Sequence, residues 1–385
     1  MSLPQTFKNN GYWTAGVGKV FHNTKADHGE AAWHEVLRFD NDDNPVEWKL
    51  RTAYEAKYGP IQDEDDRSWR RHLKDHRSEL AGQTPPGYGP TQMRDEQHKD
   101  GKNVRQVAKW LDNKAHANKP FFIACGIQKP HVPFWAPQKY FDQHPLSEIS
   151  YRPTPEGDWR NRPPLAISKR FKAFGFELEK ENDALRRKYM QAYHACISFI
   201  DAQISLLFDA LQRNGCWNDT IIIFTSDHGY HLGEHSMWGK VTLFEQCARV
   251  PMIIRVPGMT KGGTKSDALV ELVDVFPTLM QLCDINGPNE LQGKSLVPVL
   301  KNPNSEIRSA AYTVVSRGKT LGRSIRTRRW HYGEWGNMDQ AELYDLNNDP
   351  YEDNNLASEP GYAAQVRQLH SLLIETQTQA ESKHR

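Results

Sequence analysis

The chain has 385 residues, with 49 Lys and Arg against 48 Asp and Glu, which gives a formal net charge of +1. This balance gives no reason to expect nucleic acid or an anionic membrane as a partner. No run approaches the roughly 18 consecutive apolar residues that a transmembrane helix needs, so we expect no membrane span. The length predicts one large domain with a smaller one appended.

The five cysteines are odd in number, and no pair has the Cys-x-x-Cys spacing of a thiolate zinc site. A disulfide scaffold is not expected at this density, and most of the cysteines are expected to be small buried apolar residues. The first residues, MSLPQTFKNNGYW, lack the apolar core of a signal peptide. Two alternatives stay open: an internal protein, or a protein whose true N-terminus lies upstream of this chain.

In chain order, residues 5–22 predict a short helix, a turn and a strand. Residues 23–100 are polar and predict a long loop-like region with one helix at most. Residues 102–115 place apolar side chains on one helical face, and the continuous apolar run that follows, KPFFIACGIQ, predicts a strand. A fully apolar strand after an amphipathic helix indicates a sheet that is buried on both faces.

Further along, residues 136–180 are rich in proline and predict irregular structure. A long helix is predicted from about Asp183 to Asn214, a strand at IIIFTS, another strand at 249–258, and a helix at 268–283. Strands that alternate with helices predict an α/β domain with a mostly parallel sheet flanked by helices.

The pattern of apolar and polar residues changes after KNPNSE at residues 301–306. The runs AAYTVVS, SIRTRRWHYGEW and ELYDLNNDPYEDNNLA predict antiparallel strands and turns, and a final helix is predicted over about 361–380. We therefore predict a large domain at residues 1–301 and a small C-terminal α+β subdomain with an antiparallel sheet at residues 302–385.

Three predicted strands end in cationic or metal-ligating side chains, and ligands of α/β sheets bind beyond the carboxyl ends of the strands. These strand ends and the nearby WGK run supply Lys19, His22, His131, Asp227, His228 and Lys240.

Each of these residues has a simpler explanation when it is taken alone. A single lysine after a strand is usually solvated, a single histidine is usually structural, and an Asp-His-Gly turn can cap a helix. Three strand ends of the same chemical kind are harder to assign to chance. Together they predict a metal held by Asp227 and His228 inside a ring of cationic groups, which suits a sulfate or phosphate ester.

The run TSDHG…LGEH…WGK…LFE…RVPMIIRVPG resembles the core signature of the sulfatase family, within the alkaline-phosphatase-like superfamily. The stretches LPQTFKNNGYWTAGVGKVFH and KPHVPF are similar to segments of its iduronate-2-sulfatase branch. The run ELYDLNNDPYEDNNLA resembles the end of the sulfatase C-terminal subdomain. The similarity extends from about Leu3 to Ala357, and it is weakest over 23–100 and 136–180.

The resemblance implies a role for each of the six residues. Asp227 and His228 match two ligands of a divalent cation, usually Ca²⁺ in this family. The two lysines, Lys19 and Lys240, match those that neutralise the sulfate oxygens.

The two remaining histidines match residues that act on the reacting groups. His22 matches the histidine that contacts the nucleophile, and His131 matches the one that protonates the departing alcohol. Ca²⁺ prefers six to eight oxygen ligands and imidazole better suits Mn²⁺ or Zn²⁺, so the identity of the metal stays open. For His231 and His235 we expect loop support or solvent exposure, and for Glu234 a hydrogen bond within its loop.

Two elements of the family pattern are not found in this sequence. Sulfatases attack with a formylglycine made from Cys or Ser in Cys-x-Pro-x-Arg, and none of the five cysteines stands in that context. The family's first strand, which ends in an Asp-Asp metal pair, is also not found. Asp42-Asp43 and Asp65-Asp66 lie in polar loops and are not expected to replace it. We expect that a preceding portion with the nucleophile is missing, that strand edges are left unpaired, and that this chain alone is inactive.

The expected function is hydrolysis of sulfate esters of sugars or glycosaminoglycan fragments, with a sulfated carbohydrate as partner. Phosphodiester or phosphonate monoester hydrolysis on the same scaffold is one alternative, and non-catalytic binding of a sulfated glycan is another. The resemblance suggests a periplasmic, secreted or lysosomal location for a full-length protein, although this sequence alone does not establish one.

Overall fold

Three parallel strands form the sheet that carries the N-terminal site residues. The structure is a computed structural model, and it describes residues 1–21, 29–39, 45–61, 68–69, 71–72, 87–117, 119–178 and 180–382. Strand β1 (Trp13–Gly18) lies between β2 (Glu35–Leu37) and β4 (Phe121–Gly126). In the β1–β4 register Gly18 is opposite Gly126, so both strands end at the same edge of the sheet.

Strands β1 and β4 differ in burial although both are apolar. All six residues of β1 are buried, because it has a hydrogen-bonded strand on each side. Five of the six residues of β4 are only half-buried. In the described part of the chain β4 pairs with β1 alone, so one of its edges remains open. The expectation of a sheet buried on both faces therefore holds fully for β1 and only partly for β4.

A second pair of strands continues the sheet beyond this open edge. Strand β6 (Ile222–Thr225) pairs antiparallel with β9 (Met252–Arg255). Residues of β4 and β6 share one hydrophobic cluster on each face, with Ile123 and Ile222 in the first and Phe122 and Ile223 in the second. No backbone hydrogen bond joins β4 to β6 within the described residues. The expected unpaired strand edges are therefore present at this point.

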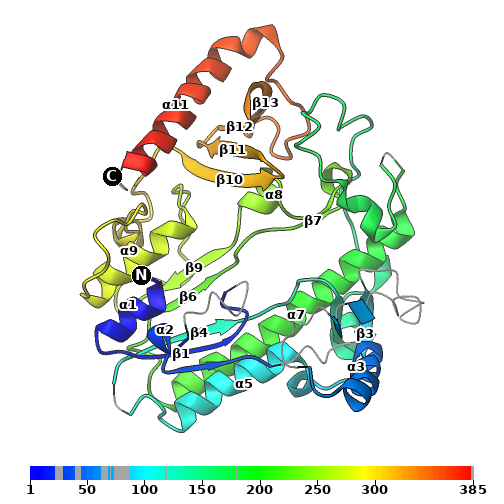
Figure 1. The fold of residues 1–385 in the computed structure, drawn as a ribbon. Coiled ribbons are helices and arrows are strands. Elements are labelled where there is room, and N and C mark those ends of the chain that lie inside the picture. Colours follow the sequence, from blue (N-terminus) through cyan, green and yellow to red (C-terminus); the bar gives the residue numbers. More distant parts are fainter. Residues whose placement is uncertain are drawn as a thin grey trace.

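Helices cover both faces of the sheet (Figure 1). On one face, α5 (Lys99–Asp112) and α7 (Asp183–Arg213) pack against β1 and β4. On the other face lie α1 (Leu3–Asn9) and α9 (Val275–Cys283). By length and composition alone α7 could cross a membrane; in this fold it packs against α5, α6, β3 and β5.

The C-terminal part forms an antiparallel sheet, which we call the C-terminal sheet (Figure 1). Its order is β10-β11-β12-β13, and α11 packs across it through Leu369 and Leu373 against Tyr332 and Leu343. The bounds are β10 Ala311–Arg317, β11 Thr320–Arg326, β12 Trp330–Trp335, β13 Asn337–Asp345 and α11 Ala363–Ser382. An antiparallel C-terminal sheet was predicted, whereas the domain boundary at residues 301 and 302 stays a prediction.

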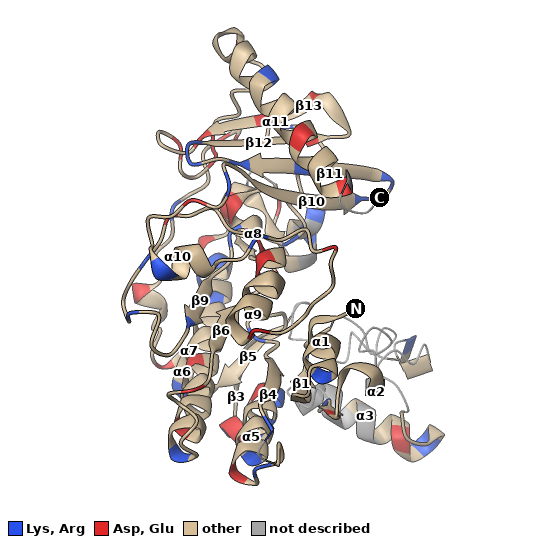
Figure 2. Cartoon of the chain, turned by 90° about the vertical axis from the view of Figure 1, so that its left-hand side faces the viewer, with Lys and Arg blue, Asp and Glu red and all other residues tan. Residues whose placement is uncertain are grey.

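Apart from α3 (Pro45–Tyr58), which has 14 residues, the remaining elements are short and lie mainly in the loops around the sheet. The other helices are α2 (Gly29–Ala32), α6 (Gln138–Phe141), α8 (Glu245–Ala248) and α10 (Val297–Lys301), and the strands are β3 (Tyr88–Thr91), β5 (Phe134–Pro137), β7 (His231–Leu232) and β8 (Trp238–Gly239). The 3₁₀ turns are Asp95–Gln97, Leu146–Glu148, Lys169–Phe174, Glu234–Ser236, Leu272–Asp274 and Pro360–Tyr362. Basic and acidic residues are interspersed over the described part of the chain (Figure 2).

Two predictions from the sequence need correction. The helix expected at 268–283 begins only at Val275, because the carboxylate of Asp274 accepts hydrogen bonds from the backbone N–H groups of Glu271 and Lys294 and fixes a turn there. The region 23–100 contains more structure than one helix, since β3 pairs in parallel with β5. The β3 sequence YGPT has no apolar alternation and gave no strand signal.

A buried guanidinium joins the C-terminal sheet to the rest of the molecule. Arg162 donates to Asp158 Oδ1 at 2.7 Å, to the carbonyl oxygen of Glu352 at 2.6 Å and to the hydroxyl of Tyr344 at 3.2 Å. Its side chain is only 1% exposed and that of Asp158 2%. His235 approaches Asp158 Oδ2 at 3.2 Å from a third segment. Segments more than a hundred residues apart in the sequence therefore meet at one ion pair.

A second buried pair, His331 and Glu352, predicts a pH dependence of stability. The carboxylate of Glu352 helps to raise the pKa of His331 above 6.5 despite burial, and His331 lowers the pKa of Glu352 below 4.5 despite burial. The contribution of the histidine is complete below pH 6.5 and is lost as the pH rises through its folded pKa. The contribution of Glu352 is complete above pH 4.5 and is lost as the pH falls through its folded pKa.

We expect His331→Asn to lower the free energy of unfolding by about 3–5 kcal/mol between pH 4.5 and 6.5, because it leaves a buried carboxylate without its partner. The difference from the unaltered protein should shrink towards pH 9, and urea unfolding across the pH range measures it. Glu306→Gln in the exposed pair Arg328–Glu306 is the control, with an expected loss below about 1 kcal/mol. A loss for His331→Asn that does not vary with pH would contradict the prediction.

Candidate active site

The described site residues lie at the edge of the sheet where β1, β4 and β6 end. Lys19 directly follows β1, and Asp227 lies two residues beyond the end of β6. The ammonium nitrogen of Lys19 is 3.6 Å from Asp227 Oδ2, with the side chains 26% and 65% exposed respectively. The carboxyl ends of β1 and β6 therefore open onto one solvent-accessible site.

Asp227, His228 and Lys240 form a chain of contacts in this site. His228 Nδ1 lies 2.9 Å from the carbonyl oxygen of Gly229, which can only accept, so Nδ1 carries the proton. His228 Nε2 is then the basic nitrogen; it lies 2.7 Å from Lys240 Nζ and 3.4 Å from Asp227 Oδ2. The lone pair of Nε2 thus accepts from the Lys240 ammonium group, with a carboxylate oxygen of Asp227 beside it.

Two glycines allow the ends of β1 and β4 to approach each other closely. Gly18 has a φ of 74°, and a Cβ there would lie 2.1 Å from the carbonyl oxygen of Gly126. A Cβ on Gly126 would in turn lie 2.3 Å from the backbone carbon of Lys19. Neither position accepts a side chain without moving the backbone. The backbone of Lys19 is therefore fixed by the contact between these two strand ends.

His131 lies within electrostatic reach of both site lysines. Burial lowers its pKa below 6.5, and the ammonium groups of Lys240, Lys19 and Lys129 lower it further, which outweighs the hydrogen bond of Nδ1 to the Val132 carbonyl. His131 is therefore neutral at neutral pH when no anion is bound.

The combined effect of burial and nearby charges lowers the pKa of both Asp227 and His228. Burial raises the pKa of Asp227, but His228, Lys19 and Lys240 outweigh it, and the net pKa lies below 3.8. Burial lowers the pKa of His228, and the two lysines add to this, although Asp227 opposes it. At neutral pH the site therefore offers an ionised carboxylate and a neutral imidazole, the protonation states in which both residues bind metal ions.

Five of the six predicted residues therefore come together in the structure. His22 lies outside the described residues, as do Asp42, Asp43, Asp65 and Asp66. The roles assigned to all six stay predictions.

Asp100, which was not identified from the sequence, binds the backbone of the segment just before His131. The carboxylate of Asp100, in the first turn of α5, accepts from the backbone N–H groups of Gln128 and Lys129, both at 2.8 Å. Asp100 is 1% exposed. An acidic residue at a helix start looks solvated in the sequence, so no local signal identifies this contact.

The two other histidines of the segment after β6, His231 and His235, prove to be structural. His231 Nε2 lies 2.8 Å from Thr242 Oγ1, and both His231 and His235 are buried. The expected loop support is confirmed and the alternative of solvent exposure is wrong. Glu234 Oε2 accepts from the backbone N–H of Leu232, as expected for a loop partner.

A second group of metal-ligating side chains lies apart from the strand ends. Ligand atoms of Asp158, His235 and Asp353 lie within 4.8 Å of one another. Both carboxylate oxygens of Asp158 already accept from Arg162, and Arg152 forms an ion pair with Asp353. A guanidinium thus occupies the position that a cation would need, and this triad does not fit a metal ion.

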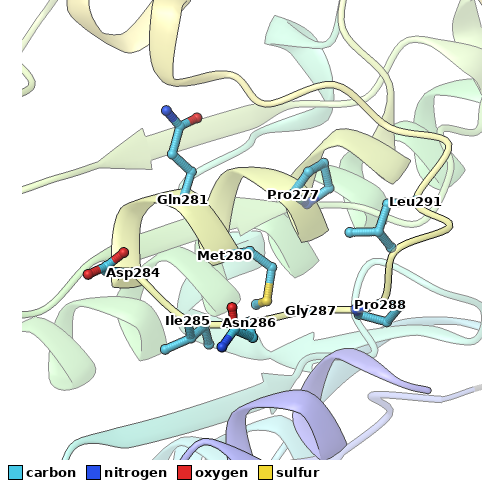
Figure 3. Close-up of a pocket in the computed structure, with 9 residues that line it drawn as sticks. All are labelled: Pro277, Met280, Gln281, Asp284, Ile285, Asn286, Gly287, Pro288 and Leu291. Atoms are coloured by element: carbon cyan, nitrogen blue, oxygen red, sulfur yellow. The ribbon is translucent and has the colours of Figure 1, made fainter.

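Two surface pockets also lie elsewhere. One, of about 340 Å³, is formed by the end of α9 and the loop after it (Figure 3). The other, of about 480 Å³, lies between Trp330 and α11. None of the predicted site residues lines either pocket. The chemistry-bearing residues lie instead at the sheet edge described above.

The model of the sulfatase family matches residues 1–285, which include all six predicted site residues. The chain belongs to the sulfatase family. A second model, for the C-terminal part of N-sulphoglucosamine sulphohydrolase, matches residues 233–379.

Characterised relatives are similar over nearly the whole chain. A sulfatase of Formosa agariphila is 30% identical, over 97% of this chain and 69% of that relative. Human iduronate 2-sulfatase is 28% identical, over 92% of this chain and 76% of its own length. The alkaline-phosphatase-like fold class predicted from the sequence is confirmed by solved structures of sulfatases.

Two of the solved structures illustrate the range of chemistry on this fold. One, in complex with its substrate D-glucosamine-2-N,6-O-disulfate, has a TM-score of 0.68 and 21% identity over 99% of this chain and 82% of its own. The phosphonate monoester hydrolase of Silicibacter pomeroyi has a TM-score of 0.75 and 20% identity over 99% and 80%. At these identities the likeness establishes the fold alone.

Sulfatase-family proteins generally bind a divalent metal ion. A carboxylate oxygen of Asp227 and the unprotonated ring nitrogen of His228 lie 3.4 Å apart at the sheet edge, and both are ligand types that such an ion takes. Lys240 Nζ lies 2.7 Å from that nitrogen, so the ammonium group has to move away before His228 can bind an ion. Asp227 and His228 supply two of the ligands that a divalent cation needs, and the described residues show no third His, Cys, Asp or Glu ligand beside them.

The electrostatics of His131 give a test that needs no turnover. We expect Lys240→Met to raise the pKa of His131 towards 6.5, because it removes one of the cations that disfavour protonation. Burial should still hold the pKa below 6.5. Titration of the imidazole by NMR measures the shift, and Lys139→Met, an exposed lysine paired with Asp95, is the control with no expected shift. An unchanged His131 pKa in Lys240→Met would contradict the arrangement.

Proposed function

We propose that this chain is part of an enzyme of the iduronate-2-sulfatase type. Such an enzyme would hydrolyse sulfate esters of sugars or of glycosaminoglycan fragments. The observation that carries the proposal is the convergence of Lys19, Lys240 and His131 on the pair Asp227–His228 at one sheet edge. Two ammonium groups beside a carboxylate–imidazole pair suit an ester of a small oxyanion. Identity of 28% to human iduronate 2-sulfatase supports the substrate class.

In this proposal the chain's own residues bind and polarise the ester. Lys19 and Lys240 neutralise the non-bridging sulfate oxygens, and Asp227 and His228 hold the divalent cation. Ca²⁺ is the first choice, with Mn²⁺ or Zn²⁺ as alternatives, because one of the two ligands is a nitrogen. When bound, the cation supplies positive charge where the ester carries negative charge.

His131 donates the proton to the departing alcohol oxygen. His131 is neutral in the free site, so this role requires that it take up a proton when the anionic ester binds between the two lysines and offsets their effect on its pKa. His22 is assigned to contact with the nucleophile. The bridging oxygen gains charge as the S–O bond breaks, so a proton placed there lowers the barrier.

We further propose that the attacking group comes from polypeptide outside these 385 residues, as formylglycine in a Cys-x-Pro-x-Arg segment. None of the five cysteines has that context, and burial raises the pKa of the Cys125 thiol to about 12, so that thiol stays protonated. The open edges of β4 and β6 support a strand between them. For the complete protein we propose a periplasmic, secreted or lysosomal location.

The 385-residue chain alone is expected to show no turnover of p-nitrophenyl sulfate above the uncatalysed rate, because the nucleophile is absent. The complete protein with the added segment should cleave the sulfate ester and lose at least about 100-fold in rate with His131→Ala. Turnover is followed at 400 nm with and without Ca²⁺. Robust turnover by the 385-residue chain would overturn the proposal.

Fold similarity to a phosphonate monoester hydrolase at a TM-score of 0.75 keeps phosphonate or phosphodiester hydrolysis as the alternative reaction. The same assay with p-nitrophenyl phenylphosphonate and bis-p-nitrophenyl phosphate separates the two. A higher kcat/KM for either of these than for the sulfate ester would favour the alternative.

Removal of a cation ligand gives a test that does not depend on turnover. Asp227→Asn should weaken binding of Ca²⁺ or Mn²⁺ by at least about tenfold, measured by isothermal titration, because it removes a charged ligand. Asp219→Asn, an exposed aspartate in a loop before β6, is the control. If a sulfated glycan binds Asp227→Ala as tightly as the unaltered chain and without metal, the protein is a non-catalytic glycan-binding protein instead.

A further inference from the structure

The residue after Lys240 is held in a backbone conformation that its side chain disfavours. Val241 has a φ of 68°, in the left-handed region, and it is β-branched. Gly239 on the other side of Lys240 also has a positive φ, of 120°. Lys240 therefore leaves the chain between two unusual backbone positions. Such a conformation persists only where the surrounding structure enforces it.

The enforcing contact comes from the C-terminal sheet. Arg317, the last residue of β10, donates from Nη2 to the carbonyl oxygen of Val241 at 2.8 Å. Its guanidinium lies 5.2 Å from the ring centroid of Trp335, which is 2% exposed and donates to Glu342. The arginine is thus fixed on its own sheet and reaches across to the site loop.

The neighbouring residues of the loop are anchored separately. Thr242 Oγ1 bonds to the buried His231, and Leu243 packs in one cluster with Trp335. These contacts hold the loop after Val241, whereas Arg317 holds the carbonyl of Val241 itself. One residue earlier, Lys240 Nζ lies 2.7 Å from His228 Nε2.

We propose that Arg317 is a positioning residue for Lys240: it holds Val241 in the left-handed conformation and thereby aims the ammonium group at the site. The position of Lys240 follows from the geometry alone, and only the value of that position for sulfate binding rests on the proposed function. The C-terminal sheet then acts on the site through the backbone, without touching the ester.

The test reads the position of Lys240 directly in the 385-residue chain. Acetylation by N-hydroxysuccinimide acetate is followed residue by residue with mass spectrometry. In Arg317→Met, which keeps the apolar stem but removes the donor, Lys240 should be acetylated at least threefold faster, because its amine is no longer held against His228. Arg317→Lys, which keeps a donor, should stay within twofold of the unaltered chain. Lys19 and Lys139 serve as internal references with unchanged rates.

Arg323→Met is the matched control for general loosening of the same sheet. Arg323 lies on β11 and pairs with Glu334 and Gln377, with no contact to residues 239–243 among its bonds. An equal rise at Lys240 in Arg323→Met and Arg317→Met, or no rise in Arg317→Met, overturns the proposal. Arg317→Leu, which also lacks a donor, replaces Arg317→Met if circular dichroism shows that the latter does not fold. The acetylation rate does not depend on turnover. A negative sulfatase assay therefore leaves the acetylation result valid, and a negative acetylation result leaves the proposed sulfatase function untouched.

Discussion

The buried contact between Arg162 and Asp158 is the interaction on which the relative placement of the two sheets depends. A charged pair removed from water is stable only when its remaining donors and acceptors are satisfied. Here the Glu352 carbonyl and the Tyr344 hydroxyl come from the C-terminal part, and His235 comes from the loop between β6 and β8. Loss of the hydroxyl or the carbonyl would leave a buried N–H donor of Arg162 unpaired, and loss of Asp158 would leave the charge of Arg162 uncompensated. The network therefore fixes where the loop that ends in Lys240 lies against the C-terminal sheet.

This placement explains why site residues come from positions so far apart in the sequence. The first lysine follows a parallel strand, while the second follows a short hairpin strand whose loop rests on β10. Their positive charge is gathered next to one carboxylate and two neutral imidazoles. This environment lowers the pKa of both His131 and Asp227, so the imidazole is neutral and the carboxylate is ionised. Both protonation states favour an anionic ligand together with a cation.

The sequence allowed the main α/β elements to be predicted, and also that five candidate site residues gather at one sheet edge, because both depend on local patterns. The apolar runs of β1, β4 and β6 identify strands, and the rule that ligands bind at carboxyl ends then places Lys19, His131 and Asp227 at one edge. The contact of Asp100 with residues 128 and 129 could not be predicted, nor could the pairing of β3 with β5. Both are tertiary contacts between segments whose own composition indicates solvent or loop. The late start of α9 has the same origin, since Lys294, far along the chain, helps to fix Asp274.

The close contact of Gly18 with Gly126 restricts where this scaffold can diversify. The edge that presents Lys19 is bare backbone packed against bare backbone, so side-chain replacement there has no room to reshape the site. Any change in what this site binds must instead come from segments other than these two strand ends. Replacement of Gly18 or Gly126 would displace the backbone that carries Lys19, so the position of this lysine cannot be adjusted by a local change of side chain.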